Sequence, residues 1–444
     1  MAPFLFIKYL SLALTATRSL ILAAVLGPSS FGLLGTLVVV QQNLSYAALG
    51  MRESVTVRLA RPFEDGDGRE QVISSALAWG LVTGLGILAG IVLIDRWIQP
   101  LSAPWLWVGI LASLSILNEI LINIHRDVGQ LSKVALLELV YNAAPMACVV
   151  YFGRGITVEI VLQAMAAGLV ASVAAFVWGI RGSVRAALVR RPLIAQLIRL
   201  GLPMAVASFF SASISSIYVL IANHAHDGVV IGLVAFANSM CMMVLFGSNM
   251  VAWAATSQTM KGLTAATADT TELRTRRLAL FFRAAVAASS VAILLSHFAL
   301  ERWLPAYVGA ERYALYFCLI QGISLLLYNE LNYLAVQGKS LAVAAGYGTI
   351  LGATLLAHLA MPSLDIASLV TFGIALSVVA GWACIWYCER EGLRSPLGAP
   401  SRRLFLAFPL VCALATGFGG TSGSAIMVGL FLVATVASLR WARP

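Results

Sequence analysis

One arginine lies within a strongly apolar stretch of this sequence, where a charge is energetically costly. Arg18 lies inside the first apolar stretch, at about residues 4–26. A helix rises about 1.5 Å per residue, so Arg18 would lie near the midplane of a bilayer or just beyond it. A charge there costs about 2.5 to 3.5 kcal/mol on insertion scales unless it faces a wet cavity or a partner. Helical spacing puts Lys8, Ser11, Thr15 and Arg18 on one face.

The residue types on this face predict a binding site for an anion. A guanidinium makes bidentate hydrogen bonds to phosphate oxygens and stays protonated, so we expect Arg18 to bind a phosphate-bearing ligand in a wet cavity. Lys8 would make a first contact at the mouth of the cavity, and Thr15 lies between the two cations. The alternatives are that Arg18 pairs with a buried carboxylate or reaches the membrane surface, and that Lys8 is only a topology signal.

Polar side chains recur at helical spacing in three later apolar stretches. They predict hydrogen-bonding walls of a cavity; the alternatives are bonds between helices and serines that bond back to their own helix. The stripes consist of Gln41, Gln42 and Ser45; of Ser208, Ser211, Ser215 and Tyr218; and of Gln321, Ser324, Tyr328 and Asn332.

Three carboxylates lie close to the ends of their predicted spans. Glu119 and Glu138 fall at similar depth on consecutive helices, so we expect them to share a proton. Glu330 is expected to pair with Arg283 on the preceding span. These groups predict proton coupling or a gate, and the alternative is structural pairing between helices.

Cofactor and metal chemistry have little support in the sequence. His224, His226 and Asp227 are close together, but we expect no metal site there. The sequence has no GxxxxGK[ST] loop, so we expect no nucleotide hydrolysis and no cofactor. The six cysteines lie in or beside apolar stretches and predict neither a disulfide framework nor a zinc site.

The elements that carry these residues must be membrane helices. The chain is 60% hydrophobic and 11% charged, with a mean hydropathy of +0.91, which predicts an all-α polytopic membrane protein. We expect about fourteen transmembrane helices. Their approximate positions are 4–26, 31–50, 71–94, 104–124, 134–152, 158–180, 201–224, 229–253, 279–299, 313–336, 341–361, 366–387, 404–419 and 425–439.

The distribution of basic residues predicts the orientation. With the N-terminus inside, the inner segments hold most of the 29 Lys and Arg residues, and the outer loops hold only Arg96, Arg154, Arg302 and Arg312. Both termini are therefore expected in the cytoplasm. This asymmetry also explains the net charge of +10 without a nucleic-acid partner.

The spans are expected to form two pseudo-symmetric six-helix lobes around a central cavity. The predicted domains are residues 1–180, a cytoplasmic amphipathic linker at 181–200, residues 201–390, and an extra helix pair at 404–440. A repeat supports the two lobes: Asn118-Glu119 and Asn329-Glu330 each precede a short loop, a lysine and a new span. In the linker, apolar residues from Leu193 to Ile198 share a face, so we expect it to lie on the inner membrane surface, held by anionic lipids.

Several motifs resemble those of Wzx-type oligosaccharide flippases. These flippases belong to the superfamily that also holds the MATE exporters and the lipid II flippases. The motifs are LAAVLGPSSFGLLGTL, RLGLPMAVASFF, WLPAYVGAERYALYFCLI and LAVQGKS, in that order along the chain. The resemblance implies two six-helix lobes whose cavity opens alternately inward and outward, and a substrate made of a polyprenyl diphosphate carrying a few sugars.

The sequence thus predicts a non-enzymatic flippase for such a lipid-linked oligosaccharide in a bacterial inner membrane, acting in surface polysaccharide biosynthesis. The expected partners are this substrate and membrane lipids, together with a polysaccharide polymerase and export machinery. A MATE-like cation-coupled exporter of small molecules is the first alternative. A membrane glycosyltransferase or polymerase is less favoured because every predicted outer loop is short. A scaffold that transports nothing would not need Arg18.

Overall fold

The computed structural model describes residues 2–60, 68–97, 103–127, 129–225, 227–264, 268–326, 339–362 and 364–390. Every element within these ranges is a helix, and ten helices are long and apolar enough to cross a membrane. The chain is therefore an all-helical, multi-pass membrane protein, as its composition predicts. The count of fourteen spans is not confirmed, because the predicted pair at 404–419 and 425–439 lies outside the described residues. The first two predicted spans lie together in α1, on either side of a kink at Gly27.

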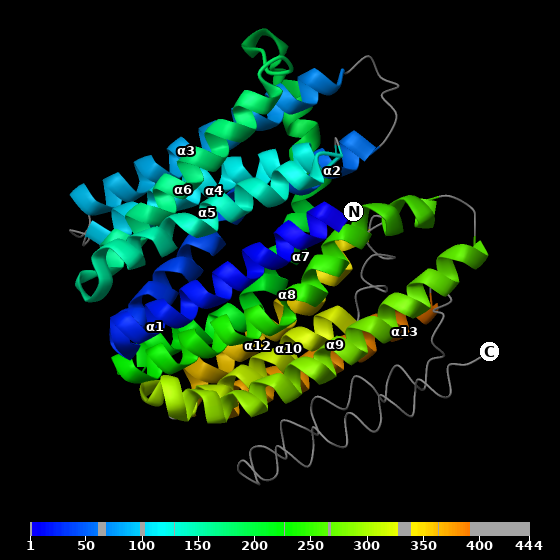
Figure 1. Cartoon of the computed structure of the whole chain (residues 1–444). Helices are drawn as coiled ribbons and strands as arrows, with labels where there is room; N and C mark the ends of the chain where they lie inside the picture. The colour runs from blue at the N-terminus through cyan, green and yellow to red at the C-terminus, as the bar shows by residue number, and fades with distance from the viewer. Residues whose placement is uncertain are drawn as a thin grey trace. The chain divides into compact units, whose positions relative to one another are not determined.

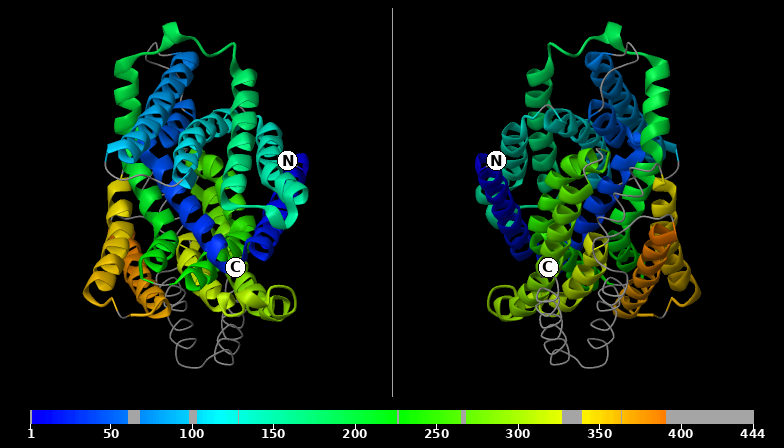
Figure 2. Two further views of the ribbon diagram at one scale, coloured as in Figure 1. Left: turned by 90° about the vertical axis from the view of Figure 1, so that its left-hand side faces the viewer. Right: turned by 90° about the vertical axis from the view of Figure 1, so that its right-hand side faces the viewer.

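The chain divides into two compact units, Met1–Phe209 and Phe210–Pro444, and we call them unit 1 and unit 2. Figures 1 and 2 show their helices. Unit 1 contains α1 (Ala2–Ser45), η1 (Tyr46–Ala48), α2 (Met51–Ala60), α3 (Arg69–Trp97), α4 (Ala103–Asp127), α5 (Leu131–Phe152), η2 (Gly153–Gly155), α6 (Val158–Ile180), η3 (Ala186–Leu188) and the beginning of α7 (Arg191–Ala225). Unit 2 contains the rest of α7, with α8 (Gly228–Thr264), α9 (Ala268–Trp303), η4 (Pro305–Tyr307), α10 (Ala310–Leu326), α12 (Ser340–Ala360) and α13 (Ile366–Arg390).

A break at Gly27 and Pro28 separates the two predicted spans within α1. Gly27 has φ 71° and ψ 170°, a conformation that glycine adopts without a steric penalty. Pro28 has no N–H to donate, and its ring clashes with the carbonyl four residues earlier, so it cannot continue a regular helix. The Leu26-Gly27-Pro28 motif therefore has a direct structural effect: it ends the part of α1 that carries Lys8 and Arg18.

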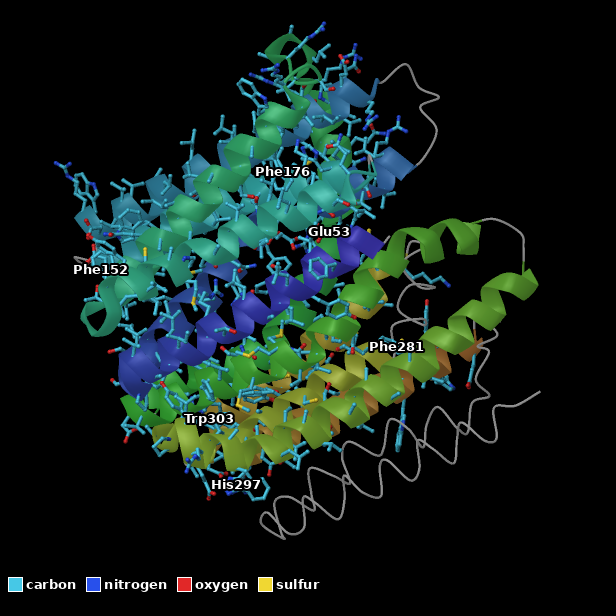
Figure 3. All side chains as sticks on the ribbon, viewed as in Figure 1. Glu53, Phe152, Phe176, Phe281, His297 and Trp303 are labelled. Atoms are coloured by element: carbon cyan, nitrogen blue, oxygen red, sulfur yellow. The ribbon has the colours of Figure 1, made fainter. Side chains whose placement is uncertain are left out.

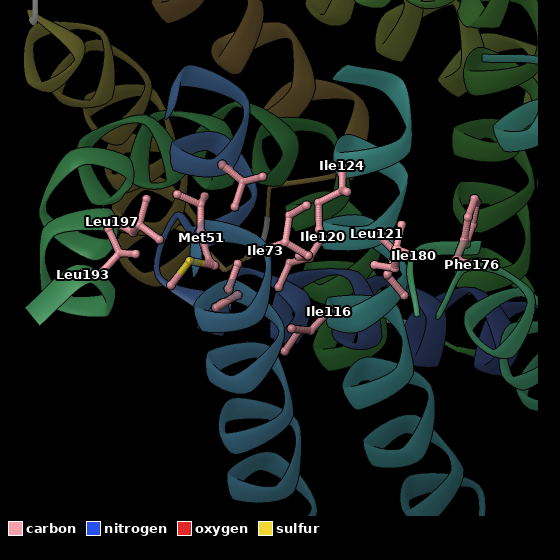
Figure 4. Packing of buried hydrophobic residues seen from close by; sticks show 14 of the residues in the cluster. Met51, Ile73, Ile116, Ile120, Leu121, Ile124, Phe176, Ile180, Leu193 and Leu197 are labelled. Carbon is pink, nitrogen blue, oxygen red and sulfur yellow. The ribbon is translucent and has the colours of Figure 1, made fainter. Parts of the chain in front are cut away.

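The core of unit 1 forms around α4, which packs against α1, α2, α3 and α6. Ile116, Ile120 and Ile124 recur every four residues on one face of α4, and each is almost completely buried. They belong to one buried cluster with Met51 from the beginning of α2 and Phe176 from α6 (Figure 4). The same apolar periodicity that predicts a membrane helix thus builds a protein core.

The beginning of α7 corrects the expected linker. Leu193 and Leu197 are 3% and 1% exposed and belong to the core of unit 1, where they lie near Met51 (Figure 4). Their apolar face is therefore covered by protein and does not lie on a lipid surface. The segment is amphipathic, as its sequence predicts. Periodicity alone does not show whether the apolar face packs against a protein core or against a membrane surface.

Two glycines bring α7 against the beginning of α2. Gly50 has φ +82°, and a Cβ atom added to Gly201 would lie 1.9 Å from the carbonyl oxygen of Gly50. The two backbones are in direct contact, so neither position has room for a side chain. Consequently the division between the units falls inside α7 and not in the predicted linker at 181–200.

The core of unit 2 is built around α10, which packs against α8, α9 and α13. Aromatic residues fill it: Tyr218 from α7 lies 5.8 Å from Phe317 between ring centroids, and Phe236 from α8 lies 4.5 Å from Tyr307. A Cβ atom at Gly373 of α13 would lie 2.0 Å from the Tyr218 hydroxyl oxygen. Gly373 therefore allows this hydroxyl to approach the backbone of α13.

Candidate functional site

The polar face of α1 turns toward α5. Arg18 is partly buried, and its Nη1 donates a hydrogen bond to Oδ1 of Asn142 at 3.3 Å. The amide nitrogen of Asn142 in turn donates to Oγ of Ser11 at 3.1 Å. Among the described residues, Arg18 forms no ion pair. Its partner is a neutral amide, so its full positive charge is available to a ligand.

Lys8 lies on the same face but has a different partner. It is 5% exposed, and its Nζ forms an ion pair with Oε2 of Glu138 on α5. Thr15, between the two cations, donates to the carbonyl of Ser11 at 2.8 Å, within its own helix. The structure thus brings together all four residues of the predicted stripe, but it gives Lys8 a carboxylate and Arg18 an amide.

A second cationic cluster, which the sequence analysis did not identify, surrounds Arg52 at the beginning of α2. Its Nη2 and Nε donate to Oε1 of Glu53 at 2.6 and 3.0 Å, and its Nη1 donates to Oε2 of Glu119 at 2.8 Å. The guanidinium carbon lies 5.4 Å from the centre of the Tyr46 ring. Burial acts to lower the pKa of Arg52, but Glu53 and Glu119 outweigh it and hold this pKa well above its ordinary value. Arg52 is therefore a permanent cation with two acidic partners.

A small recess lies beside this cluster. Its polar lining comes from Ser45, Tyr46, Arg52, Glu53 and Glu119, and Figure 3 labels Glu53. The recess has about 10 Å³ of space for the centre of a water molecule, close to the minimum that one ordered water needs. In this conformation the recess admits water and not a sugar or a phosphate group.

The predicted stripe at the end of α1 is split between the interior and the surface. Gln41 is buried, and its Nε2 donates to Oγ of Ser115 on α4 at 2.7 Å. Gln42 is exposed, and its carbonyl accepts a hydrogen bond from Oγ of Ser45 at 2.8 Å. Of the three, only Gln42 is exposed: Ser45 is buried and lines the recess beside Arg52, and Gln41 holds α1 against α4.

The two predicted carboxylates that the structure describes, Glu119 and Glu138, each have a cation of their own. Glu119 pairs with Arg52 and Glu138 pairs with Lys8, so the geometry favours two separate ion pairs over a proton shared between the two acids. Glu330 and Tyr328 lie outside the described residues. Arg283 falls within α9, but its side chain is outside the description, so its pairing with Glu330 stays a prediction.

The two stripes predicted in unit 2 face each other. Ser215 on α7 is buried and accepts a hydrogen bond from Nε2 of Gln321 on α10. Tyr218 is fully buried and donates to the carbonyl of Leu369 at 3.5 Å. Ser211 lies beside the hydroxyl of Tyr347 on α12. Ser215 and Tyr218 thus lie in the interior of unit 2, while Ser211 and Gln321 are partly buried, and their role as walls of a cavity stays a prediction.

The role of α12 was missed although its pattern is present in the sequence. Tyr347, Thr354 and His358 recur at helical spacing, and each of them faces α7. His358 lies 6.3 Å from His224 between ring centroids. Asp227, which follows His224 in the sequence, accepts the N–H groups of Val229 and Val230 and so caps the beginning of α8.

Comparisons with known proteins identify the fold. No family model matches the sequence, and no curated protein matches it. A crystal structure of a MATE mutant is 15% identical, covers 87% of this chain and 93% of its own, and superposes with a TM-score of 0.65. The outward-facing conformation of a multidrug resistance MATE family transporter of the MOP superfamily is 14% identical, covers 86% and 95%, and gives 0.62.

A third structure, the Vibrio cholerae MATE transporter VcmN carrying one substitution, is 12% identical, covers 89% and 98%, and gives a TM-score of 0.60. At these identities the likeness concerns the fold. The chain therefore has the fold of MATE transporters.

Proposed function

We propose that this protein is a flippase that moves a polyprenyl-diphosphate-linked oligosaccharide from the inner to the outer leaflet of a bacterial inner membrane by alternating access. The observation that carries the proposal is the state of Arg18. This guanidinium lies within a helix that is long and apolar enough to span a membrane, and it donates to the neutral amide of Asn142 at 3.3 Å. A guanidinium of this kind matches the paired oxygens of a phosphate or a carboxylate, and a diphosphate offers several such oxygens.

The chemistry of the substrate explains the need for this residue. A diphosphate and several sugars cannot enter hydrocarbon unaided, because burying an unpaired charge costs many kcal/mol. Arg18, with Asn142 and Ser11 beside it, offers donors that replace water around the phosphate oxygens. The prenyl tail is apolar and stays in the lipid. A cation with a neutral partner is therefore the essential feature for this cargo.

Two ion pairs of unit 1 supply the gate. Lys8 and Arg52 are cations whose acidic partners, Glu138 and Glu119, lie on α5 and α4. A diphosphate that enters would compete with these carboxylates for the cations, so substrate binding and opening of the pairs would occur together. In this scheme Lys8 and Arg52 act after Arg18, because each must first release a carboxylate.

A MATE-like exporter of organic cations is the second candidate, supported by the fold. Such an exporter needs a carboxylate that is available to the drug. Glu119 and Glu138, the intramembrane carboxylates that were predicted and are described, both have cationic partners. The described chemistry of unit 1 therefore favours an anionic over a cationic substrate.

The membrane potential is a suitable energy source for this direction of transport. A negative charge that moves from a negative interior to the outer face gains about 2.3 kcal/mol per 100 mV. A polysaccharide polymerase and export machinery would then take up the oligosaccharide on the outer side. These partners follow from the proposed substrate.

The test is binding of a short-chain polyprenyl diphosphate sugar to the purified protein. We compare the wild type with Arg18→Gln, which removes the charge and keeps a donor for Asn142, and with Arg181→Gln, an exposed arginine, as the matched control. We expect Arg18→Gln to weaken binding at least tenfold and Arg181→Gln to leave it unchanged. Competition by inorganic diphosphate would show that the phosphate groups carry the affinity. Saturable binding of a cationic dye in the absence of any binding of the diphosphate sugar would overturn the proposal.

A further inference from the structure

Polar side chains form four successive levels inside unit 2, and we call them the polar ladder. The ladder lies between α7, α10 and α12. Its levels are Ser211, Ser324 and Tyr347; Ser215 and Gln321; Tyr218 and Thr354; and His224 and His358. The Arg18 site does not include any of these residues.

The levels follow one another along two parallel helices. Ser211, Tyr218 and His224 occur in this order on α7, and their partners Tyr347, Thr354 and His358 occur in the same order on α12. At 1.5 Å per residue, the part of α7 from Ser211 to His224 is about 20 Å long. The hydrocarbon core of a bilayer is about 30 Å thick, so the ladder extends over most of a membrane crossing.

Two of its buried polar atoms have no hydrogen-bond partner among the described residues. Nδ1 of His358 is one, and the side chain of this histidine is 8% exposed. The other is the hydroxyl of Tyr347, which faces Ser211 and Ser324 without a hydrogen bond of regular geometry and belongs to a residue 9% exposed. Buried polar atoms of this kind are normally satisfied by ordered water.

We propose that the polar ladder holds a chain of internal water molecules through which His358 takes up a proton. His224 is exposed at the end of the ladder and connects it to solution. His358 comes next and is a group that changes protonation near neutral pH in many proteins. The hydroxyls and the amide further along have no charge, and they can both donate and accept hydrogen bonds, as a proton path requires.

The charged groups at this end of unit 2 already have roles. Asp227 caps α8, and Asp365 accepts the N–H of Ser368 at 3.1 Å and so caps α13. Arg312 on α10 interacts electrostatically with Asp365. The aromatic neighbour of His358 is the imidazole of His224. Within the described residues, the ring beside His358 is thus that of a second titratable histidine.

The proton transfer balances without a further reactant. Nδ1 of His358 gains a proton from a bridging water, and that water regains one from its neighbour or from His224. The net change is one proton removed from solution and one positive charge placed on His358. If the proposed function is correct, this proton is a coupling ion for the return of the empty carrier, and that consequence rests on the proposed function.

The test follows the protonation of His358 directly, without substrate. The full-length protein, labelled with ¹⁵N at its five histidines and placed in lipid nanodiscs, is titrated from pH 5 to 9 by NMR. The signal that is absent from His358→Gln is assigned to His358. We expect this signal to titrate reversibly and its ring N–H to exchange with water. A signal that stays unchanged over the whole range would overturn the proposal, as would a response to Na⁺ and not to pH.

Three further variants test the proton path without relying on His358→Gln, which could disturb folding. Tyr347→Phe and Thr354→Val preserve shape and remove one hydroxyl each, and we expect each to reduce proton uptake into proteoliposomes under an imposed potential at least fivefold. His297→Gln is the matched control, since His297 also lies in unit 2 but faces Glu311 at 2.9 Å. It should leave the titration of His358 and the proton uptake unchanged. Equal uptake by the wild type and both ladder variants would contradict the path.

The result also separates this inference from the proposed function. Titration of His358 in a protein that binds no diphosphate sugar would sustain the proton path and reject the flippase. Binding of the diphosphate sugar with a silent His358 would reject the path alone.

Discussion

Unit 1 holds ion pairs and an arginine among its polar side chains, whereas the polar ladder in unit 2 is neutral at most levels. In unit 1, Lys8 pairs with Glu138 and Arg52 pairs with Glu53 and Glu119, while Arg18 has an amide partner. In unit 2, hydroxyls, an amide and two imidazoles meet between α7, α10 and α12. Unit 1 thus has the chemistry to bind an anion, and unit 2 has the chemistry to conduct a proton.

This difference has an energetic consequence. A charge left without its partner in a low-dielectric interior costs several kcal/mol, whereas a neutral hydrogen bond contributes about 1 kcal/mol on balance. Substitutions at equivalent depth should therefore be far more damaging in unit 1 than in unit 2. Four experiments test this comparison and the boundaries of the two units.

The largest effect is expected for Lys8→Met. The substitution leaves the half-buried carboxylate of Glu138 without its cation, and we expect the free energy of unfolding to fall by about 3 kcal/mol. Replacing both residues in Lys8→Met/Glu138→Leu should restore most of this loss, because two apolar side chains leave no charge behind. Thermal unfolding in detergent gives the measurement. A double variant as unstable as the single one would show that the ion pair itself is not the cause.

Leu197→Ala tests whether the beginning of α7 belongs to the core of unit 1. Leu197 is 1% exposed, and its truncation leaves a cavity that should cost about 2 to 4 kcal/mol. Leu200→Ala, three residues later at a side chain that is 37% exposed, should cost less than about 1 kcal/mol and serves as the control. Equally small losses of unfolding free energy in both variants would indicate that this segment lies on a membrane surface and not in the core of unit 1.

Gly201→Ala and Gly373→Ala compare close contacts in the two units. A Cβ at Gly201 meets the backbone of Gly50, which cannot move alone, so we expect a loss of about 2 to 3 kcal/mol in unit 1. A Cβ at Gly373 meets the hydroxyl oxygen of Tyr218, which moves only if the whole buried side chain shifts, so the loss in unit 2 should be about 1 to 2 kcal/mol. Gly182→Ala has open space around it and is the control. The reverse order of the two losses would contradict the contact geometry.

The smallest effect is expected for Ser215→Ala in unit 2. It removes the acceptor of Gln321, a neutral amide that is only partly buried, and should cost about 1 kcal/mol. Chemical denaturation measures this loss against that of Lys8→Met. If Ser215→Ala proves as damaging as Lys8→Met, the energetic distinction between the units is wrong.

The sequence was sufficient to predict the helices and the faces that their polar residues share. Composition predicts a membrane protein, and the spacing of Lys8, Ser11, Thr15 and Arg18 correctly predicts one common face. The partners were not predictable, because Asn142 lies 124 residues from Arg18 and its position depends on how α5 packs against α1. Arg52 was missed since it follows a predicted span directly and was counted as a topology signal.

At α7 and at α12, the partner of a helix face could not be predicted from the sequence for the same physical reason. An apolar stripe such as Leu193 and Leu197 fits a lipid surface and a protein core equally well, and only tertiary packing decides between them. Similarly, the stripes on α7 and α10 were predicted as walls of a cavity, but Tyr347 and Thr354 of α12 cover one of them. Local periodicity identifies a polar face without identifying what lies opposite.

The pairing of Lys8 with Glu138 also has a consequence for the synthesis of the protein. The two residues are 130 positions apart, and a ribosome adds about 5 to 20 residues per second, so α1 emerges roughly ten seconds before its partner helix. Throughout that interval Lys8 and Arg18 enter the membrane without Glu138 or Asn142. The cations of the nascent α1 are therefore paired within the protein only after α5 has been synthesised.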